Sequence, residues 1–366
     1  MYALGDTVTL LGDLMHQFDY SRLQNNTWDG EILSLIAQIY AYKGKQELYN
    51  RMKPVELERL VEIAKIQSTE SSNKIENIGT SSARMKQLMA ERTAPRNRNE
   101  QEILGYRDVL DLIHNNYEYI EISKNVILQL HRDLLQYTPL TYRGQFKNTQ
   151  NYISEIVSDR SINIIFTPLE PYKTPQAIDD SCESYKRIIA SEAIDPLLLI
   201  PIFILDFLCI HPFNDGNGRM SRLLTALLLY KSDFIVGKYI SIEKKIETTK
   251  LEYYDALARS SSNWKEGKND YLPFIKYMLG IILSCYRDLE KRIEVSDRAS
   301  SAYDIVKVVV DDTLGKFTKQ QIWELCPSIS RASVENALKK LTEEKLIVRL
   351  GAGPSTAYIK TKISLK

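Results

Sequence analysis

Cysteine is scarce in this sequence, and no two cysteines stand in a C-x-x-C spacing. The four present, Cys182, Cys209, Cys285 and Cys326, are far apart along the chain. This argues against a disulfide framework and against a thiolate zinc site, and it fits a reducing compartment. The N-terminal MYALGDTVTLLGDL also lacks the basic, apolar and small-residue regions of a secretory signal. We therefore expect a cytoplasmic protein.

The sequence also has no excess of charge of either sign and no long hydrophobic run. Its 48 Lys and Arg against 47 Asp and Glu leave a net charge of +1. No field of the whole protein therefore favours nucleic acid or a membrane surface. The longest apolar run, 196–205, is stopped by Asp206 and is too short to cross a bilayer. We expect no membrane association, and any nucleic-acid partner must be argued from a local feature.

Turn residues are sparse, and apolar residues recur at three- and four-residue spacing, which predicts a mainly α fold. A chain of 366 residues with 44 % hydrophobic content can bury a large core in two or three domains. The region 141–171 differs, because short β-branched and aromatic runs flank a polar turn at 158–161; it predicts an irregular β-hairpin. The clearest predicted helices are 31–42, 54–67, 100–115, 123–135 and 273–293.

The C-terminal part has a pattern of its own after a polar segment, 294–301, where we expect a domain boundary. Three helical patterns precede two strand-like runs that are joined by GAGPST. This layout predicts a small α+β domain of the winged helix-turn-helix type, with 330–341 at the recognition-helix position. The expected helices are 302–311, 318–325 and 330–341, and the expected strands are 346–350 and 357–359.

The charge of residues 301–366 leaves the partner of this predicted domain open. Eleven Lys and Arg against seven Asp and Glu give a net charge of +4. Arg331, Lys339 and Lys340 partly fit a DNA reader, but Glu335 lies among them and the segment GAGPST is uncharged. DNA binding and contact with a protein, including a second copy, both remain possible roles.

The segment HPFNDGNGRMSR, 211–222, stands between LLLIPIFILDFLCI and LLTALLLY. Both flanking runs are apolar on more faces than a surface helix is, so they predict two buried helices. Charged side chains this close to a core raise the free energy unless they are paired or used. The charged and titratable residues in question are His211, Asp215, Arg219 and Arg222.

The residue types in this segment suit phosphate chemistry. Gly216 and Gly218 flank Asn217 just before a helix that we expect to begin near Arg219, and such a turn presents backbone N–H groups to an anion. Arg219 and Arg222 are three residues apart, so both can grip phosphate oxygens from one helical turn. An acid beside a phosphate site can hold Mg²⁺, which makes Asp215 the expected ligand. His211 is then placed to act as a general base, and Phe213 is expected to anchor the loop in the core.

The same segment matches in full the HPFx[DE]GNGRxxR signature of Fic-domain proteins, and the chain therefore resembles the Fido family of protein adenylyltransferases. The resemblance implies a helical bundle with a β-hairpin flap over the active site, to which region 141–171 is similar. The stretch IETTKLEYYDALARSSSNW resembles the part that closes the nucleotide pocket, with Tyr253 and Tyr254 in place of the usual paired aromatics.

This resemblance implies transfer of AMP from ATP, with Mg²⁺, to a Ser, Thr or Tyr hydroxyl of a target protein. His211 would take the proton of the hydroxyl and Asp215 would ligate the metal. Gly216, Asn217 and Gly218 would form an anion hole. The β- and γ-phosphates would be held by Arg219 and Arg222.

Residues 72–77, SNKIEN, fit the inhibitory motif [ST]xxxE[GN] of the same family. Ser72 and Glu76 are four residues apart and are expected on one helix face, followed by Asn77. In relatives with this motif the glutamate pairs with the second arginine of the signature, here Arg222, and displaces the γ-phosphate. The same glutamate helps some relatives to remove AMP, so de-AMPylation as the main activity remains an alternative.

These expectations divide the chain into an N-terminal helical region with the inhibitory helix (1–95), a Fic catalytic core (96–295) and a winged helix-turn-helix domain (300–366). A different class of function is a DNA-binding regulator whose Fic core senses nucleotide without catalysis. The presence of His211 favours an enzyme, because a sensor needs the phosphate grip but no base. Oligomeric state stays open, and a homodimer interface is one means by which such a brake could be relieved.

Overall fold

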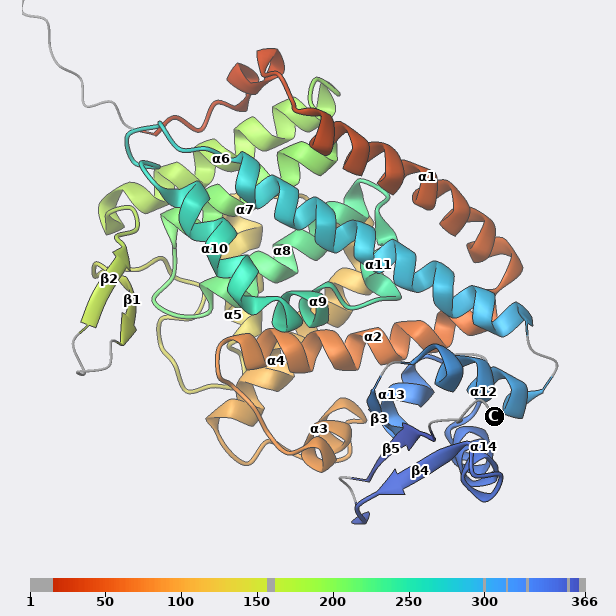
Figure 1. The fold of residues 1–366 in the computed structure, drawn as a ribbon. Helices are drawn as coiled ribbons and strands as arrows, with labels where there is room; N and C mark the ends of the chain where they lie inside the picture. The colour runs from red at the N-terminus through yellow and green to blue at the C-terminus, as the bar shows by residue number, and fades with distance from the viewer. Residues whose placement is uncertain are drawn as a thin grey trace, which may run out of the picture. The chain divides into compact units, whose positions relative to one another are not determined.

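The computed structural model describes residues 16–156, 162–298, 301–313, 315–326, 329–353 and 356–361 (Figure 1). As expected from the sequence, the fold is mainly α-helical. The chain forms two compact units, and each is described by itself. Unit 1 comprises the described parts of Met1–Asp29, Leu104–Ser232 and Thr249–Met278; unit 2 comprises those of Gly30–Ile103, Asp233–Thr248 and Leu279–Lys366.

Unit 1 is built around helix α7, Pro196–Ile210, which contacts α6, α8 and α10. Every residue of α7 after Pro196 is buried, and α8 is buried over most of its length. The prediction of two buried helices around the polar segment is therefore confirmed. The other elements of this unit are η1 (Tyr20–Asn25), η2 (Tyr117–Tyr119), α5 (Lys124–Leu134), η3 (Pro171–Lys173), α6 (Thr174–Ala190), α8 (Asn217–Lys231) and α10 (Lys250–Ser261), while α4 (Arg98–Asn116) and α11 (Leu272–Arg298) contribute residues to both units.

Asp206 interrupts the apolar sequence of α7, and three donors surround its carboxylate. Tyr20 Oη donates to Oδ2 at 3.0 Å, and Trp264 Nε1 and Tyr271 Oη donate to Oδ1 at 2.7 and 3.0 Å. Burial and the neighbouring Asp206 charge raise the pKa of both tyrosines well above the usual range. A fully buried carboxylate is tolerated here because its oxygens accept these hydrogen bonds. None of the described helices is both long and apolar enough to cross a lipid bilayer.

The expected β-hairpin is present in unit 1. Strands β1, Ile153–Ile156, and β2, Ile162–Phe166, pair antiparallel, with an irregular register between Ile153 and Ser154. The predicted polar turn, 158–161, lies outside the described residues. Helix α10 contacts β2, so the hairpin and the helix that carries the tyrosine pair are neighbours.

In unit 2, helix α2 contacts α1, α3 and α9. The predicted helices 31–42 and 54–67 are confirmed but are longer than expected, because α1 runs to Met52 and α2 to Ile75. Ser68 and Ser71 of α2 are buried and donate to Ser241 and Glu247 at 2.9 and 2.6 Å. These elements are α1 (Gly30–Met52), α2 (Pro54–Ile75), α3 (Ser82–Met89), η4 (Ile235–Lys238) and α9 (Ile242–Thr248).

The C-terminal segment of unit 2 contains three helices and a β-hairpin close to the expected positions. A third strand, β3, which the sequence did not predict, pairs with β5 and gives the order β3-β5-β4. Helix α11 continues to Arg298, so the segment from Glu294 that we expected to be a linker is still helical over its first five residues. The elements are α12 (Ala302–Asp312), β3 (Lys316–Thr318), α13 (Lys319–Glu324), α14 (Arg331–Glu343), β4 (Ile347–Leu350) and β5 (Ala357–Lys360).

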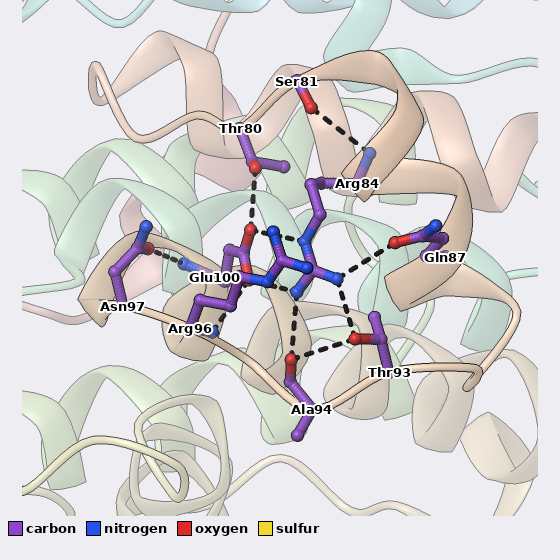
Figure 2. Close-up of polar contacts among 9 residues, drawn as sticks. All are labelled: Thr80, Ser81, Arg84, Gln87, Thr93, Ala94, Arg96, Asn97 and Glu100. Atoms are coloured by element: carbon purple, nitrogen blue, oxygen red, sulfur yellow. Dashed lines mark hydrogen bonds and ion pairs between the residues drawn. The ribbon is translucent and has the colours of Figure 1, made fainter.

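A buried ion pair joins α3 to the start of α4, and Figure 2 shows its surroundings. Arg84 donates to both oxygens of Glu100, at 3.0 Å from Nε and 2.6 Å from Nη2. Glu100 also accepts from Thr80 Oγ1 and from the backbone N–H of Arg96. These hydrogen bonds, with Arg84 the largest influence, lower the pKa of Glu100 to about 2. The ion pair therefore holds α3 against the start of α4.

We expect Glu100→Gln to lower the free energy of unfolding by about 2 kcal/mol at pH 7, because it weakens a buried pair and leaves Arg84 poorly compensated. The folded-state pKa lies below the ordinary value of 4.5, so the contribution is complete above that pH and is lost as the pH falls toward 2. Urea unfolding midpoints of wild type and variant should therefore differ most near neutral pH and converge in acid. A difference that is constant with pH would contradict this account.

Candidate active site

The polar segment forms a short loop between α7 and α8, and a left-handed residue stands at each end. His211 follows α7 with φ 51° and ψ 63°, and Gly216 precedes α8 with φ 83°. The sequence predicted this freedom for Gly216 but not for His211, where the conformation costs about 1–2 kcal/mol. Gly218, the other predicted glycine, lies inside α8, which begins at Asn217, two residues before the expected start.

The backbone contact of His211 defines its tautomer. Its Nδ1 lies 3.3 Å from the carbonyl oxygen of Leu208, in the last turn of α7. A carbonyl oxygen can only accept, so Nδ1 carries the proton of the neutral ring. The basic lone pair is then on Nε2, and His211 is only partly buried. This arrangement suits a general base.

Asn217 closes the loop with both ends of its side-chain amide. Oδ1 accepts from the backbone N–H of Phe213 at 2.9 Å, and Nδ2 donates to the Phe213 carbonyl at 2.8 Å. Asn217 is 2 % exposed and Phe213 is fully buried, as predicted for an anchor. The side chain of Asn217 is therefore engaged with the loop itself, and only its backbone could face an anion.

The segment 147–151, just before the hairpin, donates hydrogen bonds to the loop. Lys147 donates three hydrogen bonds: Nζ to the carbonyl of Ile210 at 2.9 Å and to Oδ1 of Asn151 at 3.0 Å, and its backbone N–H to the carbonyl of Pro212 at 2.8 Å. Asn151 Nδ2 donates to the carbonyls of His211 and Phe213 at 3.4 and 3.0 Å. Burial lowers the pKa of Lys147 to about 8. The sequence did not identify either residue, because a lysine and an asparagine in a polar stretch carry no periodic signal.

His131, on the buried face of α5, contacts the loop at Phe213 and Asp215. The ring stacks on Phe213 with 3.6 Å between centroids, Gly144 N–H donates to Nδ1 at 3.0 Å, and Nε2 lies 3.1 Å from the carbonyl of Asp215. Nδ1 accepts, so the proton of the neutral ring is on Nε2. Burial, aided by the Arg219 charge, lowers the pKa of His131 to about 4. A histidine among the apolar positions of α5 was the only signal in the sequence that could have revealed it.

Asp215 and Arg219 lie close together at the start of α8, and Arg222 follows in the second turn of that helix. Nη2 of Arg219 lies 3.5 Å from Oδ1 of Asp215, and the same oxygen accepts the Gly216 N–H at 2.6 Å. Arg219 is fully buried and Arg222 is 4 % exposed, whereas the side chain of Asp215 is 36 % exposed. Two buried guanidinium groups beside a helix N-terminus favour an anion, and a half-exposed carboxylate next to it can reach a cation.

Tyr253 and Tyr254 on α10 do not lie alike. Tyr253 is buried and packs against Phe274 and Tyr277, while Tyr254 is 41 % exposed and Lys250 Nζ lies 5.8 Å from its ring centroid. From the sequence we expected both tyrosines to close the nucleotide pocket as a pair. Only Tyr254 presents much of its ring to solvent.

The residues of the expected inhibitory motif are at the end of α2. Ser72 is fully buried, whereas Glu76 is partly buried and caps the helix with φ −92° and ψ 15°. Asn77 follows with φ 60°, and this left-handed residue ends the helix. The glutamate thus stands just beyond the last turn rather than within the helix. Glu76 is part of unit 2 and Arg222 is part of unit 1.

A metal site made by the protein alone is not found among the described residues, where no group of three or more His, Cys, Asp or Glu side chains converges. Mg²⁺ commonly binds through one or two carboxylates together with substrate phosphates. Asp215 fits that mode, because its partly exposed carboxylate stands at the N-terminus of α8, where phosphate would be held.

Residues 121–229 match the Fic/DOC family model. The Fic/DOC segment includes the hairpin and the loop between α7 and α8, together with His131, Lys147 and Asn151. Tyr253, Tyr254 and the motif at 72–77 lie outside it.

Relatives and solved structures agree with this match. The chain is 27 % identical over 184 residues to protein adenylyltransferase fic-1 of Caenorhabditis briggsae, covering 50 % of this chain and 32 % of that protein. It is 23 % identical over 188 residues to protein adenylyltransferase Fic of Nematostella vectensis, covering 48 % and 36 %. The chain thus spans about one third of the length of these curated relatives.

Among solved structures, a Fic family protein from Desulfovibrio desulfuricans has a similar fold, with a TM-score of 0.59 and 19 % sequence identity. The likeness covers 93 % of this chain and 99 % of that one. A Fic-1 fragment from C. elegans gives a TM-score of 0.57 at 19 % identity, covering 72 % and 73 %. At these identities the likeness establishes the fold, a Fic-type helical bundle.

The support from His131 can be tested with His131→Phe, which keeps a ring against Phe213 but removes both nitrogens. We expect a loss of about 2 kcal/mol of stability at pH 7, because Gly144 N–H and the Asp215 carbonyl lose a buried partner. Wild-type stability should rise between pH 4 and 6.5, since the folded-state pKa of about 4 lies below the ordinary 6.5 and the unfolded chain binds more protons there. Melting temperatures across this interval should rise less steeply in the variant. Parallel curves would assign the pH dependence to another group.

Proposed function

We propose that this protein is a Mg²⁺-dependent protein adenylyltransferase, which transfers AMP from ATP to a Ser, Thr or Tyr hydroxyl of a target protein. The observation that carries the proposal is the loop between α7 and α8. It combines a histidine whose basic nitrogen is Nε2 with a glycine turn and two buried arginines at a helix start. The relatives named protein adenylyltransferase support the same reaction.

In the proposed reaction His211 Nε2 takes the proton as the hydroxyl oxygen of the target attacks the α-phosphorus. The new P–O bond forms as the bond to the β-phosphate breaks, and pyrophosphate leaves. The backbone from Gly216 to Gly218 and the positive end of α8 hold phosphate oxygens, and Arg219 and Arg222 hold the β- and γ-phosphates. Asp215 would hold Mg²⁺, which neutralises phosphate charge when bound. Tyr254, and Tyr253 behind it, would border the nucleotide.

We propose that Glu76 restrains this activity by pairing with Arg222 in competition with the γ-phosphate, with Ser72 and Asn77 shaping the end of its helix. Its place just after α2, where Asn77 turns the chain, supports this reading, because a carboxylate at a helix end is presented beyond the last turn. Removal of AMP remains the alternative direction of the same site.

We also propose that residues 300–366 form a winged helix that contacts protein rather than DNA. On α14, Arg331 and Lys339 lie 3.8 Å from Glu335 and Glu343, and Lys340 lies 4.0 Å from Glu344. Each basic side chain of this helix therefore has an acid one turn away, which lowers its attraction for phosphate. The regions 1–95 and 96–295 remain our proposed inhibitory and catalytic parts.

The reaction class can be tested by intact mass after incubation with MgATP. We expect Glu76→Gly protein to gain the mass of one AMP group through self-modification. The double variant Glu76→Gly/His211→Ala should gain none, because it lacks the base, although its phosphate-binding loop is otherwise retained. Nucleotide binding by both proteins provides the control. Equal labelling of the two would exclude His211 as the base, and binding without labelling in either would favour the nucleotide sensor.

The brake can be tested separately by comparing wild type with Glu76→Gly and Glu76→Gln, using ATP labelled in the α-phosphate. We expect labelling to rise by about tenfold or more in both variants, because removal of the carboxylate charge frees Arg222 for the γ-phosphate and one pairing of about 1.4 kcal/mol corresponds to tenfold. Glu70→Gln, on an earlier turn of α2, is the matched control and should label like wild type. Equal labelling of wild type and both Glu76 variants would exclude the brake.

A further inference from the structure

Two residues, Lys147 and Asn151, donate to four consecutive carbonyls of the loop between α7 and α8. Lys147 donates to the first and the third, through Nζ at 2.9 Å and through its backbone N–H at 2.8 Å. Asn151 Nδ2 donates to the second and the fourth, at 3.4 and 3.0 Å. The four carbonyls belong, in order, to Ile210, His211, Pro212 and Phe213.

The contacts of Asn151 decide which end of its amide faces the loop. Oδ1 accepts from Lys147 Nζ at 3.0 Å, and a protonated amine can only donate. Nδ2 faces two carbonyl oxygens, which can only accept. All three partners require the same orientation, since a flipped amide would place an oxygen against two oxygens. Lys147 therefore orients Asn151, and Asn151 in turn holds the carbonyl of His211.

The residue that is held in this way is the proposed base. The N–H of His211 still donates to the carbonyl of Phe207 at 2.9 Å, as in a helix, whereas the carbonyl of His211 accepts from Asn151. The left-handed φ of 51° lies between these two contacts. In this conformation the ring Nδ1 reaches the carbonyl of Leu208, which leaves the lone pair on Nε2. The direction of the basic nitrogen thus depends on contacts made at the backbone of the same residue.

Both ends of the hairpin are tied to this support. Gln150 Nε2 donates at 3.1 Å to the carbonyl of Pro168, just beyond β2. The next residue, Leu169, donates its N–H at 3.3 Å to the carbonyl of Cys209 in the last turn of α7. The base and the hairpin therefore share one set of backbone contacts. An error of about 1 Å in placing a reacting group can lower a rate about a hundredfold, so this shared support has a direct use in the proposed reaction.

We propose that Lys147 and Asn151 are positioning residues for AMP transfer, which hold the backbone of His211 in the conformation that directs Nε2 to the target hydroxyl. Both residues act through His211. The inference rests on the proposed function, because it concerns the base of that reaction. A purely structural role would instead lower the stability of the protein without a selective effect on the transfer step.

Two substitutions in Glu76→Gly protein test the proposal. Asn151→Asp keeps the shape of the side chain and the acceptor for Lys147, but it replaces the Nδ2 donor by an oxygen that faces two carbonyls. Lys147→Met removes the amine and keeps a similar length. We expect each to lower the rate of self-labelling at saturating MgATP by about tenfold or more, while the dissociation constant of ATP changes by less than about twofold. Lys147→Arg, which keeps a charged donor, should lose less than Lys147→Met.

The matched controls are Asn116→Asp and Lys186→Met. Asn116 Nδ2 likewise donates to a backbone carbonyl, that of Leu112 at 3.1 Å, and Lys186 pairs with Glu183 on α6. Both control variants should label like the parent protein. If Asn151→Asp and Lys147→Met bind ATP and also label at the parental rate, the proposal is wrong.

The ring of His211 gives a second readout that does not need activity. The chain has four histidines, so the ring nitrogens can be followed by ¹⁵N NMR and assigned with His211→Ala. Above the ordinary histidine pKa of about 6.5, the proton should be on Nδ1 in the parent protein and no longer confined to Nδ1 in Asn151→Asp and Lys147→Met. An unchanged tautomer in both variants would exclude the positioning role, whatever the activity. A parent protein that keeps this tautomer but transfers no AMP would contradict the proposed function instead.

Discussion

The amide of Asn217, clasped to the backbone of Phe213, is the interaction on which the site depends. Helices α7 and α8 are buried over most of their length, so the polar groups of the loop between them need hydrogen-bond partners. The Asn217 side chain provides them for Phe213: it accepts from the Phe213 N–H and donates to the Phe213 carbonyl. The clasp also fixes where α8 begins, and with it the direction in which the first backbone N–H groups of that helix point. Arg219 lies in the first turn of α8 and Arg222 in the second.

Backbone strain at His211 needs support from outside the loop. The carbonyls of residues 210–213 lie at or beyond the end of α7, so they need donors from elsewhere. Lys147 and Asn151 provide these donors. The nitrogen of Lys147 is buried, which costs free energy in the charged form and so lowers the pKa of this amine. That cost is tolerated because the amine occupies a place where a carbonyl would otherwise lack a donor.

The sequence predicted the parts of this structure that depend on nearby residues. Apolar periodicity located the helices, β-branched runs located the hairpin, and a twelve-residue motif located the loop and its charged groups. The sequence did not predict His131, Lys147 or Asn151, because their contacts join residues 60 to 84 positions apart. It also missed strand β3, since three residues are too few to form a pattern. The different surroundings of Tyr253 and Tyr254 likewise arise from packing against α11.

Two histidines of the site have opposite tautomers, and backbone groups alone account for the difference. His211 faces a carbonyl through Nδ1, so that nitrogen holds the proton and Nε2 is basic. His131 faces an N–H through Nδ1, so Nε2 holds the proton and donates to the Asp215 carbonyl. A second proton on His131 would remove the acceptor for Gly144, and both burial and Arg219 oppose it. The His131 ring therefore stays neutral at neutral pH, and its contacts with Phe213, the Gly144 N–H and the Asp215 carbonyl hold the loop in one shape.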